Sequence, residues 1–188
     1  MKKTLTLTAK IIIFLIGFIF AVYHFTDWRS IGKFAVSAAH SRIEGLSYSD
    51  LSGEADSFTV NNVTLNGIAN ITSSAITIRP RILSSILSLS AVCDIDFKGL
   101  SVRFGQSLNF GDGSVLITLT RNEILLENLR TNGEFALNGY MSIDTQNMNI
   151  LKADTMISVP ESFSANMGML QRFMPLVQEG DRWYIRRR

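Results

Sequence analysis

The chain has 188 residues, and its 18 basic and 16 acidic residues give a formal net charge of +2. This near balance offers no strongly basic surface, so we expect no nucleic-acid partner. The one cysteine excludes an internal disulfide, and two histidines leave few of the commonest metal ligands and general bases. We therefore expect a domain that needs neither a metal nor another cofactor.

An uninterrupted apolar run stands close to the N-terminus, at residues 11–23. Extended to residues 5–25 it would make about 32 Å of helix, enough for a hydrocarbon core of about 30 Å. We predict a single transmembrane helix here. The expected membrane-anchor residues are Ile11, Ile12, Ile13, Phe14, Leu15, Ile16, Gly17, Phe18, Ile19, Phe20, Ala21, Val22 and Tyr23.

The lysines before this run indicate its orientation. Lys2, Lys3 and Lys10 form a tighter basic cluster than the residues that follow, which favours a cytoplasmic N-terminus. The bulk of the chain would then be periplasmic. A cleaved signal peptide is the alternative, because a basic start and a short apolar core also fit one. Cleavage needs small residues after the core, and the nearest place ends at the bulky Tyr23, which favours an uncleaved anchor.

Residues 26–45 form a short connecting region between the anchor and the rest of the chain. Within it, Ile31, Phe34, Ala35 and Ala38 have helical spacing, which predicts an amphipathic helix or linker near the membrane surface. Packing of the same residues against the following domain is the alternative. We therefore divide the chain into a tail and anchor at 1–25, this region at 26–45, and a β-rich periplasmic domain at 46–188.

Beyond Gly45 the apolar residues recur with a period of two, which is typical of strands with one buried face. Turn residues divide this region into about eight to ten short strands, with hairpin turns predicted at 111–113 and 131–133. Turns this short exclude parallel crossovers, so the sheet should be antiparallel. We predict a mainly β fold, an open curled sheet like a taco or a jelly roll, with a short helix over 163–176 and a final strand at 183–185.

The clearest alternation lies at residues 87–97, and Gly99 after it predicts a bulge. An apolar face of this kind is either a packed core or an open groove that accepts acyl chains. Periodicity does not separate the two. In the second case the groove-lining residues would include Leu87, Leu89, Ala91, Cys93, Ile95 and Phe97.

A search for catalytic and metal-binding motifs finds none. Asp94 and Asp96 form a carboxylate pair, but a spacing of two on a strand places both on the solvated face. The sequence contains no nucleophile elbow, phosphate-binding loop or Cys/His cluster. We expect a protein that works by binding and is not an enzyme.

The layout of anchor and sheet resembles the type II secretion system protein N family and the related AsmA-like proteins. The matching segments are residues 78–81, the strand at 87–97, the run at 100–108 with the glycines that follow it, and residues 170–184. The resemblance implies an inner-membrane component of the cell envelope that serves protein secretion, or a carrier or bridge for lipids. The small bitopic protein of lipopolysaccharide export has a similar layout but no matching motif.

Two functional hypotheses follow. The first is an accessory or scaffold component of a type II secretion-like system, whose partners are other envelope or secretion proteins. The second is a carrier or bridge module for lipid or lipopolysaccharide, which needs an accessible apolar groove in the sheet.

Overall fold

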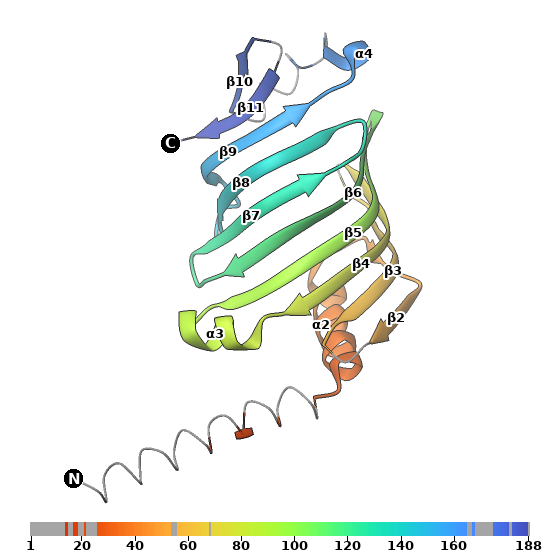
Figure 1. Ribbon diagram of the computed structural model, residues 1–188. Helices are drawn as coiled ribbons and strands as arrows, with labels where there is room; N and C mark the ends of the chain where they lie inside the picture. Colours follow the sequence, from red (N-terminus) through yellow and green to blue (C-terminus); the bar gives the residue numbers. More distant parts are fainter. Residues whose placement is uncertain are drawn as a thin grey trace, which may run out of the picture.

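The computed structural model describes residues 14, 17, 18, 21, 26–53, 56–67, 69–164, 167, 175–180 and 182–187. Within these residues, eleven strands form one antiparallel sheet in the order β1-β3-β4-β5-β6-β7-β8-β9-β11-β10, with β2 paired to the side of β3 (Figure 1). The prediction of a mainly β, open antiparallel sheet is thus confirmed.

The strands are joined mostly by short turns, so that neighbours in sequence are neighbours in the sheet. Their bounds are β1 Leu46–Ser47, β2 Asp50–Gly53, β3 Phe58–Leu65, β4 Asn70–Pro80, β5 Ala91–Phe104, β6 Gln106–Leu119, β7 Glu123–Thr131, β8 Ala136–Asp144, β9 Ile150–Ser158, β10 Leu176–Glu179 and β11 Arg182–Arg187.

Helix α2, Trp28–Arg42, precedes the sheet, as the spacing of its residues predicted. Asp27 is its N-cap, because the carboxylate accepts from the backbone N–H groups of Arg29 and Ser30 at 3.1 and 3.3 Å. The helix approaches the sheet through small residues. A Cβ added to Gly32 would lie 2.7 Å from the Phe58 ring, so only a glycine allows this close packing.

The apolar stripe predicted on α2 is not the face that packs on the sheet. Ile31 and Phe34 are 43% and 78% exposed, and Ala35 is exposed as well. The sheet instead contacts the face that carries Gly32 and Val36. The alternative in which the stripe packs against the domain is therefore wrong for these residues.

A short helix, α3 (Ile82–Ser88), connects β4 to β5. The strand predicted over residues 87–97 therefore begins too early: Leu87 is helical, and Leu89 is the C-cap in the left-handed conformation. The Ser85 hydroxyl accepts from the Val92 N–H at 2.9 Å, and the Arg81 N–H donates to the Val92 carbonyl at 2.8 Å. These bonds hold α3 at the start of β5 and keep the chain helical up to Ser88.

Two glycines bend the long β5–β6 pair. The predicted bulge at Gly99 is confirmed, with φ of +59° and a break in register between Phe97 and Leu100. The predicted hairpin at 111–113 is wrong, because β6 continues through it and the chain turns at Gly105 instead. Gly111, with φ of +68°, lies opposite Leu100 and forms part of the same irregularity.

The C-terminal part holds α4 (Glu161–Ser164) and the β10–β11 hairpin. The predicted final strand is confirmed as part of β11. Much of the helix predicted over 163–176 lies outside the described residues. The prediction is wrong for the last residue of that helix, because Leu176 begins β10 and pairs with Ile185.

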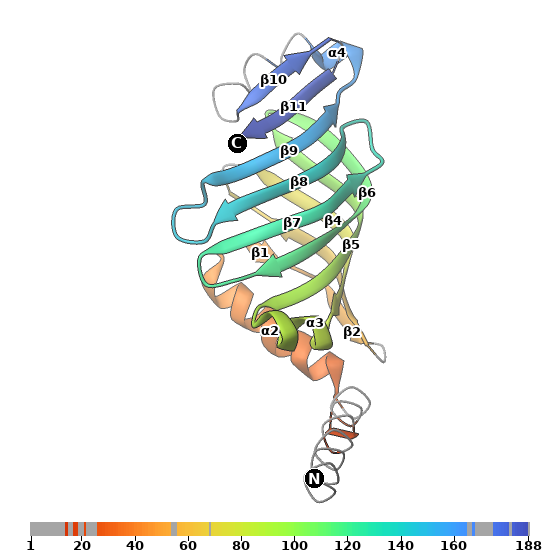
Figure 2. The same cartoon turned by 60° about the vertical axis from the view of Figure 1, so that its left-hand side comes forward.

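The sheet curls strongly. In Figure 2, β7, β8 and β9 lie in front while β1 and β4 lie behind them. Two clusters of buried apolar residues lie at the two ends of the strand order, and Val92, Phe97 and Val115 are buried on β5 and β6 between them. One cluster contains Leu51, Phe58 and Val60, and Val36 of α2 packs against it. The other contains Ala153, Ile157, Met167, Leu176 and Ile185.

Most of the predicted anchor at 11–23 lies outside the described residues. Phe14, Gly17, Phe18 and Ala21 are described and are helical. Among the residues with described structure, no helix combines the length and the apolar character needed to cross a membrane.

Candidate functional site

One face of the sheet carries rows of apolar residues that run across the strands. Directly paired residues of neighbouring strands point to the same side. The longest row follows the pairs Cys93–Ile117, Ile117–Leu126, Leu126–Met141 and Met141–Ala153, and so crosses β5 to β9. A second row joins Phe58, Ile78, Ile95 and Val115 on β3 to β6. We call the surface that holds these two rows the apolar face.

The opposite side of the same strands is mostly polar, although it includes Val92, Leu116 and Leu125. On β5 the alternate positions are Asp94 and Asp96, and both carboxylates are bound by arginines of the preceding segment. Arg81 donates to both oxygens of Asp94, at 2.5 and 2.8 Å, and Arg79 pairs with Asp96. Hydrogen bonding to Asp96 raises the pKa of the Arg79 guanidinium. The predicted solvated face is thus present, and its carboxylates are held in ion pairs.

The apolar face is covered at both ends and only half covered between them. Phe58 and Ala153, at the two ends, are 5% and 1% exposed. Between them Ile78, Ile95, Ile117, Leu126 and Met141 are of intermediate burial. Phe97 and Val115, on the same part of the face, are buried, each 8% exposed. Helix α2 supplies the cover at one end, and Met167 and Phe163 supply it at the other.

The six predicted groove-lining residues separate into two groups. Cys93, Ile95 and Phe97 lie on the apolar face, with Phe97 8% exposed and opposite Gly113. Ala91 is on the same side of β5 but is exposed. Leu87 and Leu89 belong to α3 and its cap, are 78% and 93% exposed, and do not share this face.

Sequence reasoning did not identify the part of the apolar face on β6 to β9. Ile117, Leu126 and Met141 each stand on an apolar parity that the sequence shows. These residues lie in one row only because of the register of the four strand pairs from β5 to β9, and no local sequence pattern specifies that register.

A small apolar hollow of about 100 Å³ opens where α2 meets this face. Its lining is Val36, Ala39, Leu46, Tyr48, Val60, Val63, Ile76 and Ile78. Binding pockets for drug-sized molecules measure about 300–1,000 Å³, so this hollow alone does not enclose a lipid. The candidate site is therefore the open face itself and not a closed cavity.

Cys93 places a thiol on the apolar face. Burial raises the pKa of its thiol, and the charge of neighbouring Asp94 adds to the effect. The thiol is therefore protonated at neutral pH and behaves as a small apolar side chain.

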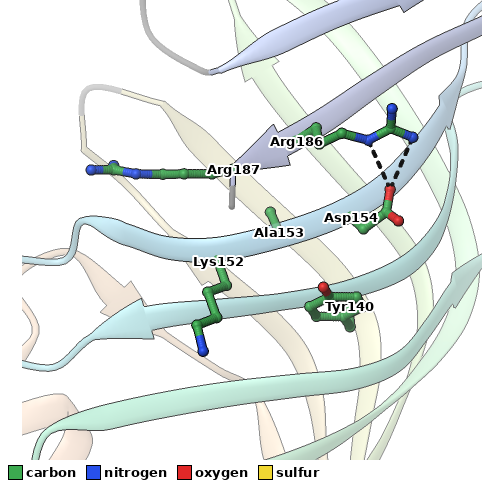
Figure 3. Close-up of a pocket in the computed structure, with 6 residues that line it drawn as sticks. All are labelled: Tyr140, Lys152, Ala153, Asp154, Arg186 and Arg187. Atoms are coloured by element: carbon green, nitrogen blue, oxygen red, sulfur yellow. Dashed lines mark hydrogen bonds and ion pairs between the residues drawn. The ribbon is translucent and has the colours of Figure 1, made fainter.

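A second hollow, of about 300 Å³, lies near the end of β11 and is lined by polar side chains (Figure 3). Arg186 is its central cation, and it is bound by Asp154 at 3.4 Å and by Glu179. Tyr140 and Lys152 line it from β8 and β9. Two carboxylates offset the charge of Arg186, while the cations Lys152 and Arg187 also line this hollow.

Across the described parts of the chain, no group of three or more His, Cys, Asp or Glu side chains has the arrangement needed to hold a metal ion. The fold and the site define a class: a single-sheet β protein that presents an open apolar face between two covered ends.

The chain belongs to a known family, because residues 2–187 match the family described as type II secretion system protein GspN-like, Synergistales. This match extends over nearly the whole chain and agrees with the expected resemblance to secretion proteins. It says nothing of AsmA-like proteins. No curated protein and no solved structure matches the chain.

Proposed function

We propose that this protein is a non-catalytic accessory or scaffold subunit of a type II secretion-like system, whose apolar face binds another envelope or secretion protein. The family match supports a role connected with secretion. The observation that carries the binding role is the half-covered row from Cys93 to Met141, which lies between two covered ends. A partner that removes an apolar strip of this kind from water lowers the free energy, so its binding is favoured.

In this proposal the chain is a single-pass protein of the inner membrane. Residues 11–23 form the anchor, the N-terminus is cytoplasmic and the sheet is periplasmic. The apolar run and the lysines before it support this arrangement. The test is extraction of cell membranes with alkaline carbonate, followed by protease treatment of spheroplasts. A chain that stays in the membrane and loses its sheet to external protease supports the topology, and a freely extracted chain contradicts it.

The alternative occupant of the apolar face is lipid. The row from Cys93 to Ala153 contains no charged or hydroxyl side chain over five strands, which suits an acyl chain. The open face favours neither occupant by shape, because a neighbouring protein or an acyl chain could lie along it. We place the protein partner first because the family is one of secretion proteins.

A photo-crosslinker at Ile117 decides between them in living cells. Ile117 is in the centre of the apolar face, and Thr118 next to it points to the other side of the sheet, so a crosslinker at Thr118 is the matched control. A protein adduct at 117 and not at 118 supports the scaffold. A lipid adduct found by mass spectrometry supports the carrier, and equal adducts at the two positions contradict both.

A further inference from the structure

Helix α3 exposes more apolar surface than any role within the sheet requires. It has no buried residue, and no acidic or basic side chain lies in its first or last turn. Leu83 and Ile86 are 56% and 54% exposed, and Leu87 and Leu89 are 78% and 93% exposed. Four large apolar side chains within residues 83–89, on one short helix and its cap, are therefore exposed to water. We call these four residues the α3 tip.

The backbone holds the α3 tip in a fixed position. Leu89 adopts the left-handed conformation, with φ of 52° and ψ of 36°, where glycine is the usual residue. Its N–H donates to the Ser85 carbonyl, and the Ser90 N–H donates to the same carbonyl at 3.2 Å. A leucine in this conformation is strained, and it gains no packing within the domain in return. Its side chain is thus presented outward by a defined structure.

Two serine hydroxyls of α3 donate hydrogen bonds within the segment. The Ser85 hydroxyl donates to the Arg81 carbonyl at 2.9 Å, and the Ser88 hydroxyl donates to the Ser84 carbonyl at 2.7 Å. Protein interfaces usually carry about one hydrogen bond per 100–200 Å². A lipid surface needs none from the protein, so apolar side chains with internally bonded hydroxyls suit lipid better than a protein partner.

The position of α3 in the fold indicates which lipid surface it meets. Both views place α3 at the end of the molecule where α2 begins (Figures 1 and 2). Helix α2 is capped by Asp27, and the apolar run ends at Tyr23. The four residues from position 24 to Asp27 span at most about 14 Å. A membrane that holds residues 11–23 therefore lies close to the start of α2.

We propose that the α3 tip inserts into the surface of the same bilayer that holds the N-terminal anchor. Leu83, Ile86, Leu87 and Leu89 then lie among the lipid headgroups and upper acyl chains, and the sheet is fixed in orientation relative to the membrane by two points of contact. This inference rests on the proposed anchoring of residues 11–23. Ile31, which is 43% exposed near the start of α2, is in a position to add to the contact.

The test uses the full-length chain reconstituted into phosphatidylcholine vesicles. Cys93 is replaced by serine, and single cysteines at Leu87→Cys, Leu89→Cys or Val177→Cys carry an environment-sensitive fluorophore. Val177 is the matched control: it is an apolar residue, 41% exposed, on β10 at the far end of the strand order. Flotation of the vesicles in a density gradient measures the anchoring separately.

We expect emission from positions 87 and 89 to shift to shorter wavelength on reconstitution and to be quenched by nitroxide lipids, while position 177 stays unchanged. Chains that float with the vesicles but show the same aqueous emission at all three positions overturn the α3 contact and leave the anchoring intact. Chains that do not float overturn both proposals. We expect a fluorophore at position 87 or 89 to leave the fold intact, because both side chains are largely exposed in the natural protein.

Discussion

The ring of Phe97 on β5 lies against the backbone of Gly113 on β6. The two residues are directly paired, and a Cβ added at position 113 would lie 2.5 Å from the Phe97 Cζ atom and would also collide with the Arg130 carbonyl oxygen. The absence of a side chain at 113 thus allows the largest residue of the predicted groove set to lie flat and buried on the apolar face.

We expect Gly113→Ala to destabilise the protein by about 1–3 kcal/mol, because the neighbouring strand must move away from the added methyl group. The measurement is the midpoint of denaturant unfolding. Gly67→Ala is the control, since the nearest atom to its Cβ would be 3.9 Å away and its backbone is compatible with alanine. Equal midpoints for the two variants would contradict the close contact between Gly113 and Phe97.

A buried hydroxyl also supports the C-terminal end of the sheet. Thr155 is fully buried, and its hydroxyl donates to the Tyr140 carbonyl at 2.8 Å. Thr155→Val keeps the shape and removes the donor, so we expect a loss of about 1–3 kcal/mol in the free energy of unfolding. Thr72→Val, at an exposed strand position, is the control and should be close to neutral. A neutral result at 155 would show that the carbonyl finds another partner.

The sequence predicted the strand alternation well and the ends of several elements poorly. The run from Ile82 to Leu89 fits a helix by spacings of three and four, and it also fits a strand by the alternation of Leu87 and Leu89. The choice depends on the hydrogen bonds between Ser85 and Val92, which form only once the chain has turned. No local pattern encodes that turn, so the strand was predicted to begin too early.

The glycines at 111 and 113 show the same limit. A Gly-Asp-Gly sequence suits a hairpin turn and also suits a bulge, because both need a residue with positive φ. The bulge is formed here, and Gly111 lies against Gly133, where an added Cβ would be only 2.8 Å from the Gly133 nitrogen. This contact joins β6 to the turn between β7 and β8, and a reading along the chain does not include it.

The candidate site was predictable on one strand and not across strands. Cys93, Ile95 and Phe97 alternate with charged residues, and that pattern alone places them together on one side. Their continuation into Ile117 and Leu126 follows from strand register, which depends on bulges at Gly99 and near Val115. A shift of one residue in either pair would move the partner side chains to the polar face.

The N-cap of α2 gives the protein a pH dependence in the acid range. The Ser30 hydroxyl and backbone N–H bind the Asp27 carboxylate and lower its pKa below 3.8. A carboxyl whose folded pKa is lowered stabilises the fold above its unfolded pKa and loses that contribution as the pH falls through the folded value. Ionised Asp27 also faces the positive end of the helix dipole.

We therefore expect Asp27→Asn to be less stable than the natural protein at neutral pH, because asparagine caps the helix without the charge. The difference in melting temperature should shrink as the pH falls below 3.8. Thermal unfolding followed by circular dichroism over this range measures it. Asp50→Asn on β2 is the control, which leaves the cap intact. A difference that stays constant with pH would contradict the role of the charge.

Cys93 provides a direct chemical measure of the open strip on the apolar face. Its thiol has a raised pKa because it is partly buried, so little of the reactive thiolate is present at neutral pH. We expect iodoacetamide to modify Cys93 slowly in the folded protein, with a rate that rises steeply toward alkaline pH. The comparison is a Cys93→Ser, Leu89→Cys variant, whose thiol stands at a position that is 93% exposed and should react several-fold faster. Unfolding in denaturant should bring the two rates together, and equal rates in the folded proteins would contradict the burial of Cys93.

Because Cys93 lies in the row that continues into Ile117, an occupant of the apolar face should slow its modification further without changing the rate at position 89.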